Sequence, residues 1–138
     1  MKIDRQAVFN KFDGKCAYTG KPLDDKWQVD HMLSKQLFGY SIMKECKDRD
    51  EYVKRLKEVD CIENLMPAIR IVNHYKRCND LEGFRNYMKT FHIRLSNLPK
   101  KTTVESTKKR IVYMNTVADL FGITPDKPFN GIFYFETK

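Results

Sequence analysis

The sequence predicts an α+β fold, in which short extended segments and a short helix form a centre that further helices surround. Short segments separated by turn residues occupy residues 15–33, and an amphipathic helical pattern begins near residue 80. The chain has 138 residues, of which 41% are hydrophobic and 32% are charged. A chain of this size and composition can bury about two thirds of its unfolded surface. We therefore expect a single domain over residues 1–138.

The first predicted elements are a short helix and a hairpin. Asp4 is a suitable N-cap for a helix over residues 5–12, which a turn ends. The next two segments, KCAYTGKPL and WQVDHML, are short and separated by turn residues, a pattern that favours a short antiparallel hairpin over a helix. His31 then lies at or just beyond the end of the second strand.

The middle of the chain contains a charged segment and the rest of the centre. Residues 34–58 combine a helical pattern with crowded charges of both signs, which indicates a solvated insertion. Residues 63–68 are extended and contain a proline, and residues 70–77 favour a short helix. The elements of the centre therefore follow the order β, β, α.

The C-terminal half is predicted to be helical up to an aromatic tail. Two capping pairs, Asn79 with Glu82 and Thr102 with Glu105, mark the starts of two helices. The second helix continues to about residue 122, and the tail predicts a loop followed by a short strand. The first helix carries an apolar stripe at helical spacing, made of Leu81, Phe84, Met88, Phe91 and Leu95.

The chain is strongly basic. It has 26 basic and 18 acidic residues, a formal net charge of +8 and a pI near 9.3. This excess favours a polyanionic partner such as nucleic acid or an anionic membrane surface, and a second explanation is solubility alone. No apolar run approaches the ~18 residues of a membrane span, and the N-terminus has no secretory type of apolar segment. We expect a cytoplasmic protein with four reduced cysteines.

Four polar residues stand where catalysis could occur. Asp30 and His31 are adjacent at a strand end, so the carboxylate could hold a divalent metal while the imidazole accepts a proton from water. Such a pair by itself is usually an incidental surface or hydrogen-bonded pair. The short helix adds Asn73, and Asn64 precedes it. An amide oxygen is a suitable neutral ligand for a hard cation.

The motifs KCAYTGK, VDHML and ENLMPAIRIVNHYK, followed by LEGFR, resemble those of the small phage-type HNH endonucleases, which are ββα-metal nucleases. The similarity covers most of the chain apart from residues 36–60. The resemblance implies a ββα-metal (HNH) centre surrounded by helices. Its motif core would span about residues 11–79, and a C-terminal extension of helices and a short strand would span about residues 80–138.

The resemblance also implies a role for each of the four polar residues. His31 would be the general base, and Asp30 and Asn73 would be the metal ligands. Asn64 would fix the loop that orients the histidine, whereas His74 receives no task. A site with one carboxylate and one amide keeps open positions for water, which suits Mg²⁺ or Mn²⁺ better than a closed structural site. Because the base must be neutral, activity should rise with pH through the usual imidazole range.

The implied activity is metal-dependent hydrolysis of phosphodiester bonds in nucleic acid, with double-stranded DNA favoured as the partner. Relatives of this kind act in phages and mobile elements, which fits the cytoplasm of a bacterial or phage-infected cell. The alternative is a catalytically silent module of the same fold that binds nucleic acid or protein. The sequence leaves open the target sequence, DNA against RNA, nicking against double-strand cutting, and the oligomeric state.

The chain departs from many relatives at the positions of a structural zinc. Those relatives bind zinc through two CxxC pairs, whereas this chain has only Cys16, with Thr19, Ile69 and Val72 at the other three positions. A threonine and two branched aliphatic residues cannot complete a tetrahedral thiolate site. We therefore expect no structural zinc, and we expect Ile69 and Val72 to fill that space as a small apolar cluster.

Basic residues recur near the motif and on the last predicted helix. Lys76 and Arg77 follow Asn73, and Lys108, Lys109 and Arg110 form a run in the C-terminal extension. Together these five residues could form a track for the phosphate backbone, which predicts binding that weakens steeply with salt. Such runs are also common on exposed helix faces that bind nothing.

Overall fold

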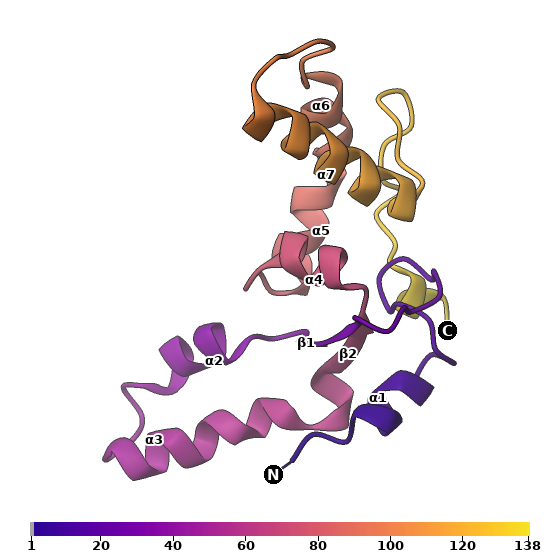
Figure 1. Ribbon diagram of the computed structural model, residues 1–138. Coiled ribbons are helices and arrows are strands. Elements are labelled where there is room, and N and C mark those ends of the chain that lie inside the picture. The colour runs from indigo at the N-terminus through magenta and orange to yellow at the C-terminus, as the bar shows by residue number, and fades with distance from the viewer. Residues whose placement is uncertain (1) are drawn as a thin grey trace.

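The computed structural model describes residues 2–138, and within this range the chain is α+β, as predicted (Figure 1). A two-stranded antiparallel sheet, β1 and β2, lies among the helices. The α-helices are α1 (Arg5–Asn10), α2 (Lys35–Ile42), α3 (Arg49–Leu56), α4 (Arg70–Lys76), α5 (Leu81–Lys89), α6 (Phe91–Ser96) and α7 (Glu105–Phe121). The strands are β1 (Gln28–His31) and β2 (Leu65–Ala68), and the 3₁₀ helices are η1 (Lys57–Asp60), η2 (Ile62–Asn64) and η3 (Tyr134–Thr137).

The sheet differs from the predicted hairpin. β1 pairs with β2, in a register that sets His31 opposite Leu65 and Gln28 opposite Ala68. The segment at residues 15–23, which we expected to pair with β1, forms only one bridge of its own, between Lys15 and Pro22. The two paired strands are therefore distant in the sequence, and α2, α3, η1 and η2 lie between them. The order β, β, α holds with β2 as the second strand.

The segment after α1 instead joins β2 to the C-terminal tail. The Ala17 amide donates to the Pro67 carbonyl of β2 at 2.8 Å, and the Phe135 amide donates to the Ala17 carbonyl at 2.8 Å. The tail is therefore held through its backbone, but it ends in η3 and not in the predicted strand. The apolar anchor of the tail is Phe133, which is fully buried.

The chain between the two strands, residues 32–64, forms an arm, and its helices α2 and α3 project to one side of the sheet (Figure 1). Ser34 caps α2 by accepting from the Leu37 amide, and Asp48 caps α3 by accepting from the Glu51 amide. α3 has no buried residue, which agrees with the solvated helical insertion that the charge pattern predicts.

The remaining helices follow the predicted order with shifted ends, but the single helix predicted to carry the apolar stripe is divided into α5 and α6 at Thr90. Asp4 caps α1 as expected, whereas Asp80, and not Asn79, caps α5 by accepting from the Gly83 amide. α7 has no side-chain cap, because Thr102 accepts from the Val104 amide before the helix begins. The predicted capping box of Thr102 with Glu105 is therefore wrong.

One cluster of buried side chains joins the centre to the C-terminal helices. Residues from the segment after α1, β2, α4, α5, α6, α7 and the tail belong to it. Cys16 and Val72 are fully buried in this cluster, and Ile69 packs against it. Ile69 and Val72 thus pack in an apolar cluster, as expected from the sequence. The predicted stripe also lies here, since Phe84, Met88, Phe91 and Leu95 are buried and Leu81 packs against them.

Across residues 2–138, none of the helices is both long enough and apolar enough to span a bilayer.

Candidate active site

His31 ends β1, and its imidazole contacts a carboxylate from the arm. Nε2 of His31 lies 2.7 Å from Oδ1 of Asp60, the last residue of η1. The other oxygen of Asp60 lies 3.2 Å from Nζ of Lys35, at the start of α2. The side chain of Asp60 is only 6% exposed, and that of His31 is 22% exposed. The histidine is therefore held from one side and open to solvent on another.

The charges around Asp60 keep its carboxylate ionised. Burial raises the pKa of Asp60, but the hydrogen bonds from His31 and Lys35 outweigh burial and hold the pKa below its ordinary value. An ionised carboxylate can only accept, so Nε2 of His31 carries the proton in this contact. The lone pair of the neutral ring then lies on Nδ1. Such a ring can take a proton from a water molecule at Nδ1.

Asn64 fixes the chain directly after His31. Its Oδ1 accepts from the Leu33 amide at 2.8 Å, and its Nδ2 donates to the carbonyls of Leu33 and Val59 at 3.0 and 2.8 Å. One side chain thus ties the segment that follows β1 to the end of the arm. This contact has the geometry expected of a residue that fixes the histidine loop.

Asn73 lies on α4 and faces β1. Its Nδ2 donates to Oε1 of Gln28 at 2.8 Å, which leaves the amide oxygen of Asn73 for another partner. Asn73 and Gln28 line a cleft of about 630 Å³ together with Asp60 and Lys35. Lys2 and Arg5 also line it, so cationic groups outnumber the carboxylate there, and His31 adjoins the cleft through Asp60.

Asp30 points toward Lys76 at the C-terminal end of α4, and its side chain is buried. The Tyr18 hydroxyl donates to Oδ2 of Asp30, and Nζ of Lys76 lies 3.3 Å from the same oxygen. Lys76 also donates to the carbonyls of His31 and Asn79, at 3.2 and 2.8 Å. Burial raises the pKa of the Asp30 carboxyl, and Lys76 and Tyr18 offset only part of that effect. Burial and Asp30 also raise the pKa of Tyr18 well above its ordinary value.

The two predicted metal ligands differ in how well they fit a cation. Asn73 offers a free amide oxygen at the cleft, which is a suitable ligand for Mg²⁺ or Mn²⁺. Asp30 is 5% exposed, and the ammonium of Lys76 already balances its charge. In this arrangement the Asp30 carboxylate does not fit a ligand role, because a metal would have to displace Lys76. Within residues 2–138, no group of three or more acidic, histidine or cysteine side chains is arranged to hold a metal.

The five basic residues predicted to bind nucleic acid do not form one track. Lys76 is fully buried, so its ammonium has no surface for a phosphate, contrary to the expectation. Its long side chain spans the interior because the Asp30 carboxylate needs a cationic partner there. Lys108 pairs with Glu105 at 3.2 Å on the exposed face of α7, and Lys109 is exposed on the same helix. Arg77 and Arg110 line one hollow beside α4.

Three residues of the site were not among the residues predicted from the sequence. Lys35 comes from the segment predicted to be a solvated insertion, and Asp60 lies two residues beyond that segment. Gln28, two residues before Asp30, holds Asn73. Strand alternation puts residues 28 and 30 on one face of β1, and this was the one available signal for Gln28. No comparable pattern marked Asp60.

Comparison of the chain with models of protein families, with curated proteins and with solved structures finds no match. Function is therefore inferred from the geometry and chemistry of the site itself.

Proposed function

We propose that this protein is an endonuclease of the HNH type that hydrolyses phosphodiester bonds, with double-stranded DNA as its substrate. His31 would be the general base, and Asn64 would hold the loop that follows it. The observation that carries the proposal is the contact of the partly exposed His31 with the buried Asp60, which lines a cationic cleft and leaves Nδ1 of the imidazole without a protein partner among residues 2–138. A base in such a position can activate water next to a bound phosphate.

The cationic groups of the cleft support the choice of substrate. Lys2, Arg5 and Lys35 line it, and only Lys35 among them forms an ion pair within residues 2–138. The substrate backbone is polyanionic, and the chain has a net charge of +8. Phosphate contacts of this kind supply affinity without sequence readout.

The proposal includes a divalent cation, Mg²⁺ or Mn²⁺. When bound, such an ion supplies positive charge that stabilises the leaving oxygen. Asn73 would be its ligand from α4, and Asp30 could join only after losing its contacts with Lys76 and Tyr18. The steps assigned to the chain itself are proton acceptance at His31 and binding of flanking phosphates in the cleft.

The decisive experiment is cleavage of supercoiled plasmid DNA by the wild type and by His31→Ala. We expect nicking or linearisation with Mg²⁺ or Mn²⁺, none with chelator, and a loss of at least about 100-fold in the variant, since general-base catalysis contributes about 10²–10⁴-fold. The variant should still bind DNA. Cleavage by His31→Ala at the wild-type rate would refute the role of the base.

A second function has one observation in its favour. The Asp30 carboxylate is closed off by Lys76 and Tyr18, as expected for a nucleic-acid-binding module that no longer cuts. In that case the folded wild type would bind DNA tightly and leave the plasmid intact with either metal. The same plasmid assay therefore separates the two functions.

A further inference from the structure

A second hollow, of about 230 Å³, lies beside α4 and is built from arginine and tyrosine side chains. α4, α5, α6 and α7 all contribute to it. Its main lining residues are Arg77, Arg94, Arg110, Tyr75, Tyr87 and Tyr113. Three guanidinium groups around one hollow are the chemistry that recognises phosphate.

Arg94 forms part of the wall and is not free for a ligand. Its guanidinium lies 4.0 Å from the centre of the Tyr87 ring, and it donates to the Tyr87 carbonyl at 2.6 Å and to Oγ1 of Thr90 at 2.6 Å. Tyr75 stacks on Tyr87 at 5.1 Å between ring centres. Tyr87 thus contacts both Arg94 and Tyr75, and these three side chains form one side of the hollow.

Arg77 and Arg110 are the two arginines that remain open. Both side chains are exposed, and neither forms an ion pair with any other residue in the range 2–138. Arg77 also has φ of +57° at the end of α4, a conformation that glycine adopts without strain and arginine does not. The chain thus keeps a guanidinium at the cost of backbone strain, a feature that concentrates at functional sites.

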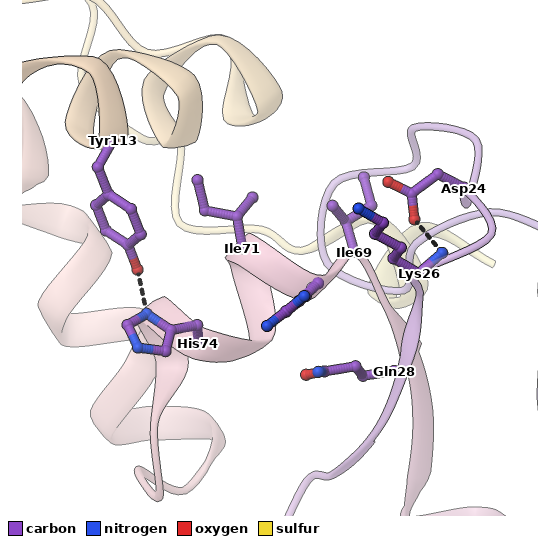
Figure 2. Close-up of a pocket in the computed structure, with 8 residues that line it drawn as sticks. Asp24, Lys26, Gln28, Ile69, Ile71, His74 and Tyr113 are labelled. Carbon is purple, nitrogen blue, oxygen red and sulfur yellow. Dashed lines mark hydrogen bonds between the residues drawn. The ribbon is translucent and has the colours of Figure 1, made fainter. Parts of the chain in front are cut away.

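The hollow connects to the catalytic cleft along α4. A third hollow, of about 490 Å³, shares His74 and Tyr113 with it and shares Gln28 with the cleft. Figure 2 shows Tyr113 reaching from α7 to His74 on α4, where its hydroxyl lies 2.8 Å from Nδ1, while Gln28 lies across from α4 on β1. Asn73 and Arg77 are four residues apart, about 6 Å along the helix axis, so one strand of nucleic acid can contact both.

We propose that Arg77 and Arg110 bind a backbone phosphate of the substrate that flanks the bond that is cut. The inference rests on the proposed function, because it assigns the hollow to the same nucleic acid. α4 then follows one strand, with Asn73 and His31 at the scissile phosphate and Arg77 at the flanking one. The role of the pair is affinity and positioning, and it involves no contact with the reacting atoms.

The test measures how tightly the double variant Arg77→Gln/Arg110→Gln binds DNA. Binding is monitored by fluorescence anisotropy of a labelled duplex and of a labelled single strand, with chelator present to prevent cleavage. The matched control is Lys44→Gln/Lys54→Gln, which removes the same charge from exposed positions on the arm. We expect the arginine variant to bind about tenfold more weakly than the control at ~0.1 M salt. Its slope of log K against log salt should fall by about 1, because the two arginines together neutralise one phosphate.

The variant Arg77→Gly separates phosphate binding from a role of Arg77 in stability. Removing the side chain also removes the strain, so this variant should unfold at higher urea concentration than the wild type while binding DNA more weakly. Binding equal to that of the control in both arginine variants would overturn the inference. A preference for the single strand that the arginine variants lose would assign the hollow to unpaired substrate.

The inference and the proposed function can fail separately. If the wild type cuts plasmid and the arginine variants bind like the control, the function stands and the phosphate site is refuted. If the wild type binds DNA through Arg77 and Arg110 without cutting, the phosphate site stands and the nuclease proposal is refuted.

Discussion

In the proposed nuclease, Asp60 would be a positioning residue for His31, because its carboxylate holds Nε2 of the ring. Asp60→Asn keeps the shape of the side chain but removes its negative charge, and the new amide can present a donor to the ring. We expect kcat for DNA cleavage to fall about 10- to 100-fold, the range of losses seen when a residue that orients a catalytic group is changed. KM should not rise, since a negative charge leaves the cationic cleft.

Lys35→Gln is the matched control. Lys35 contacts the other oxygen of Asp60 and lines the cleft, but it does not touch His31. Its loss should raise KM and leave kcat almost unchanged, the opposite signature. A kcat for Asp60→Asn equal to that of the wild type would remove Asp60 from the mechanism.

The sequence predicts some residues of the site but not others. Asp30, His31, Asn64 and Asn73 stand out because they occur in recognisable motifs, and their backbone elements adjoin as expected. Asp60 lies in a run of charged residues with no motif, and its approach to His31 depends on how the whole arm folds. The closure of Asp30 by Lys76 depends on tertiary packing in the same way, since an exposed and a buried lysine look alike in sequence.

At the scale of elements, helices were predicted well and strand pairing was not. Helical periodicity and caps are local, so α1, α4 and α7 appear close to where they were expected. Pairing is non-local: the nearby residues 15–23 were expected to pair with β1, whereas the partner is β2, an extended segment distant in the sequence that contains Pro67. Pro67 is tolerated because only its carbonyl is used, as acceptor for Ala17.

Gly122 ends α7, so substitutions at this position test the backbone conformation of the helix end. Its φ is +69°, and a Cβ built there would meet nothing within 4 Å. Gly122→Ala should therefore destabilise the protein by about 1 kcal/mol through backbone conformation alone. Gly122→Asn should cost less, because asparagine tolerates this conformation better. The measurement is the free energy of unfolding in urea, and equal values for all three proteins would contradict the left-handed cap.

At the scale of the molecule, one arginine ties the tail to α5. Arg85 makes two bonds to the carboxylate of Glu136, at 2.6 and 2.7 Å, and donates to the Gly131 carbonyl at 2.6 Å. The hydrogen bond from Arg85 is the main reason why the pKa of Glu136 lies below its ordinary value. Because the carboxyl is bound in its ionised form, its stabilisation is complete above the ordinary pKa of 4.5 and disappears as pH falls through the lowered pKa.

Glu136→Gln should therefore destabilise the protein by about 1–2 kcal/mol at pH 7, and the difference from the wild type should shrink below pH 4.5. The measurement is urea unfolding over a range of pH. Glu82→Gln is the control, because Glu82 also pairs with Arg85 but is 68% exposed, so its change should cost less than about 0.5 kcal/mol. A difference for Glu136→Gln that does not vary with pH would contradict the ion pair.

The arm begins and ends at one point of the molecule. The Met32 amide donates to the Asn64 carbonyl at 2.9 Å, so the chain leaves and re-enters the sheet across a single hydrogen bond. The turn between α2 and α3 should therefore tolerate inserted sequence. A fluorescent reporter or a DNA-binding module added there would leave both ends of the arm fixed. A change of length at this turn would alter what the protein carries and leave the spacing of its central residues unchanged.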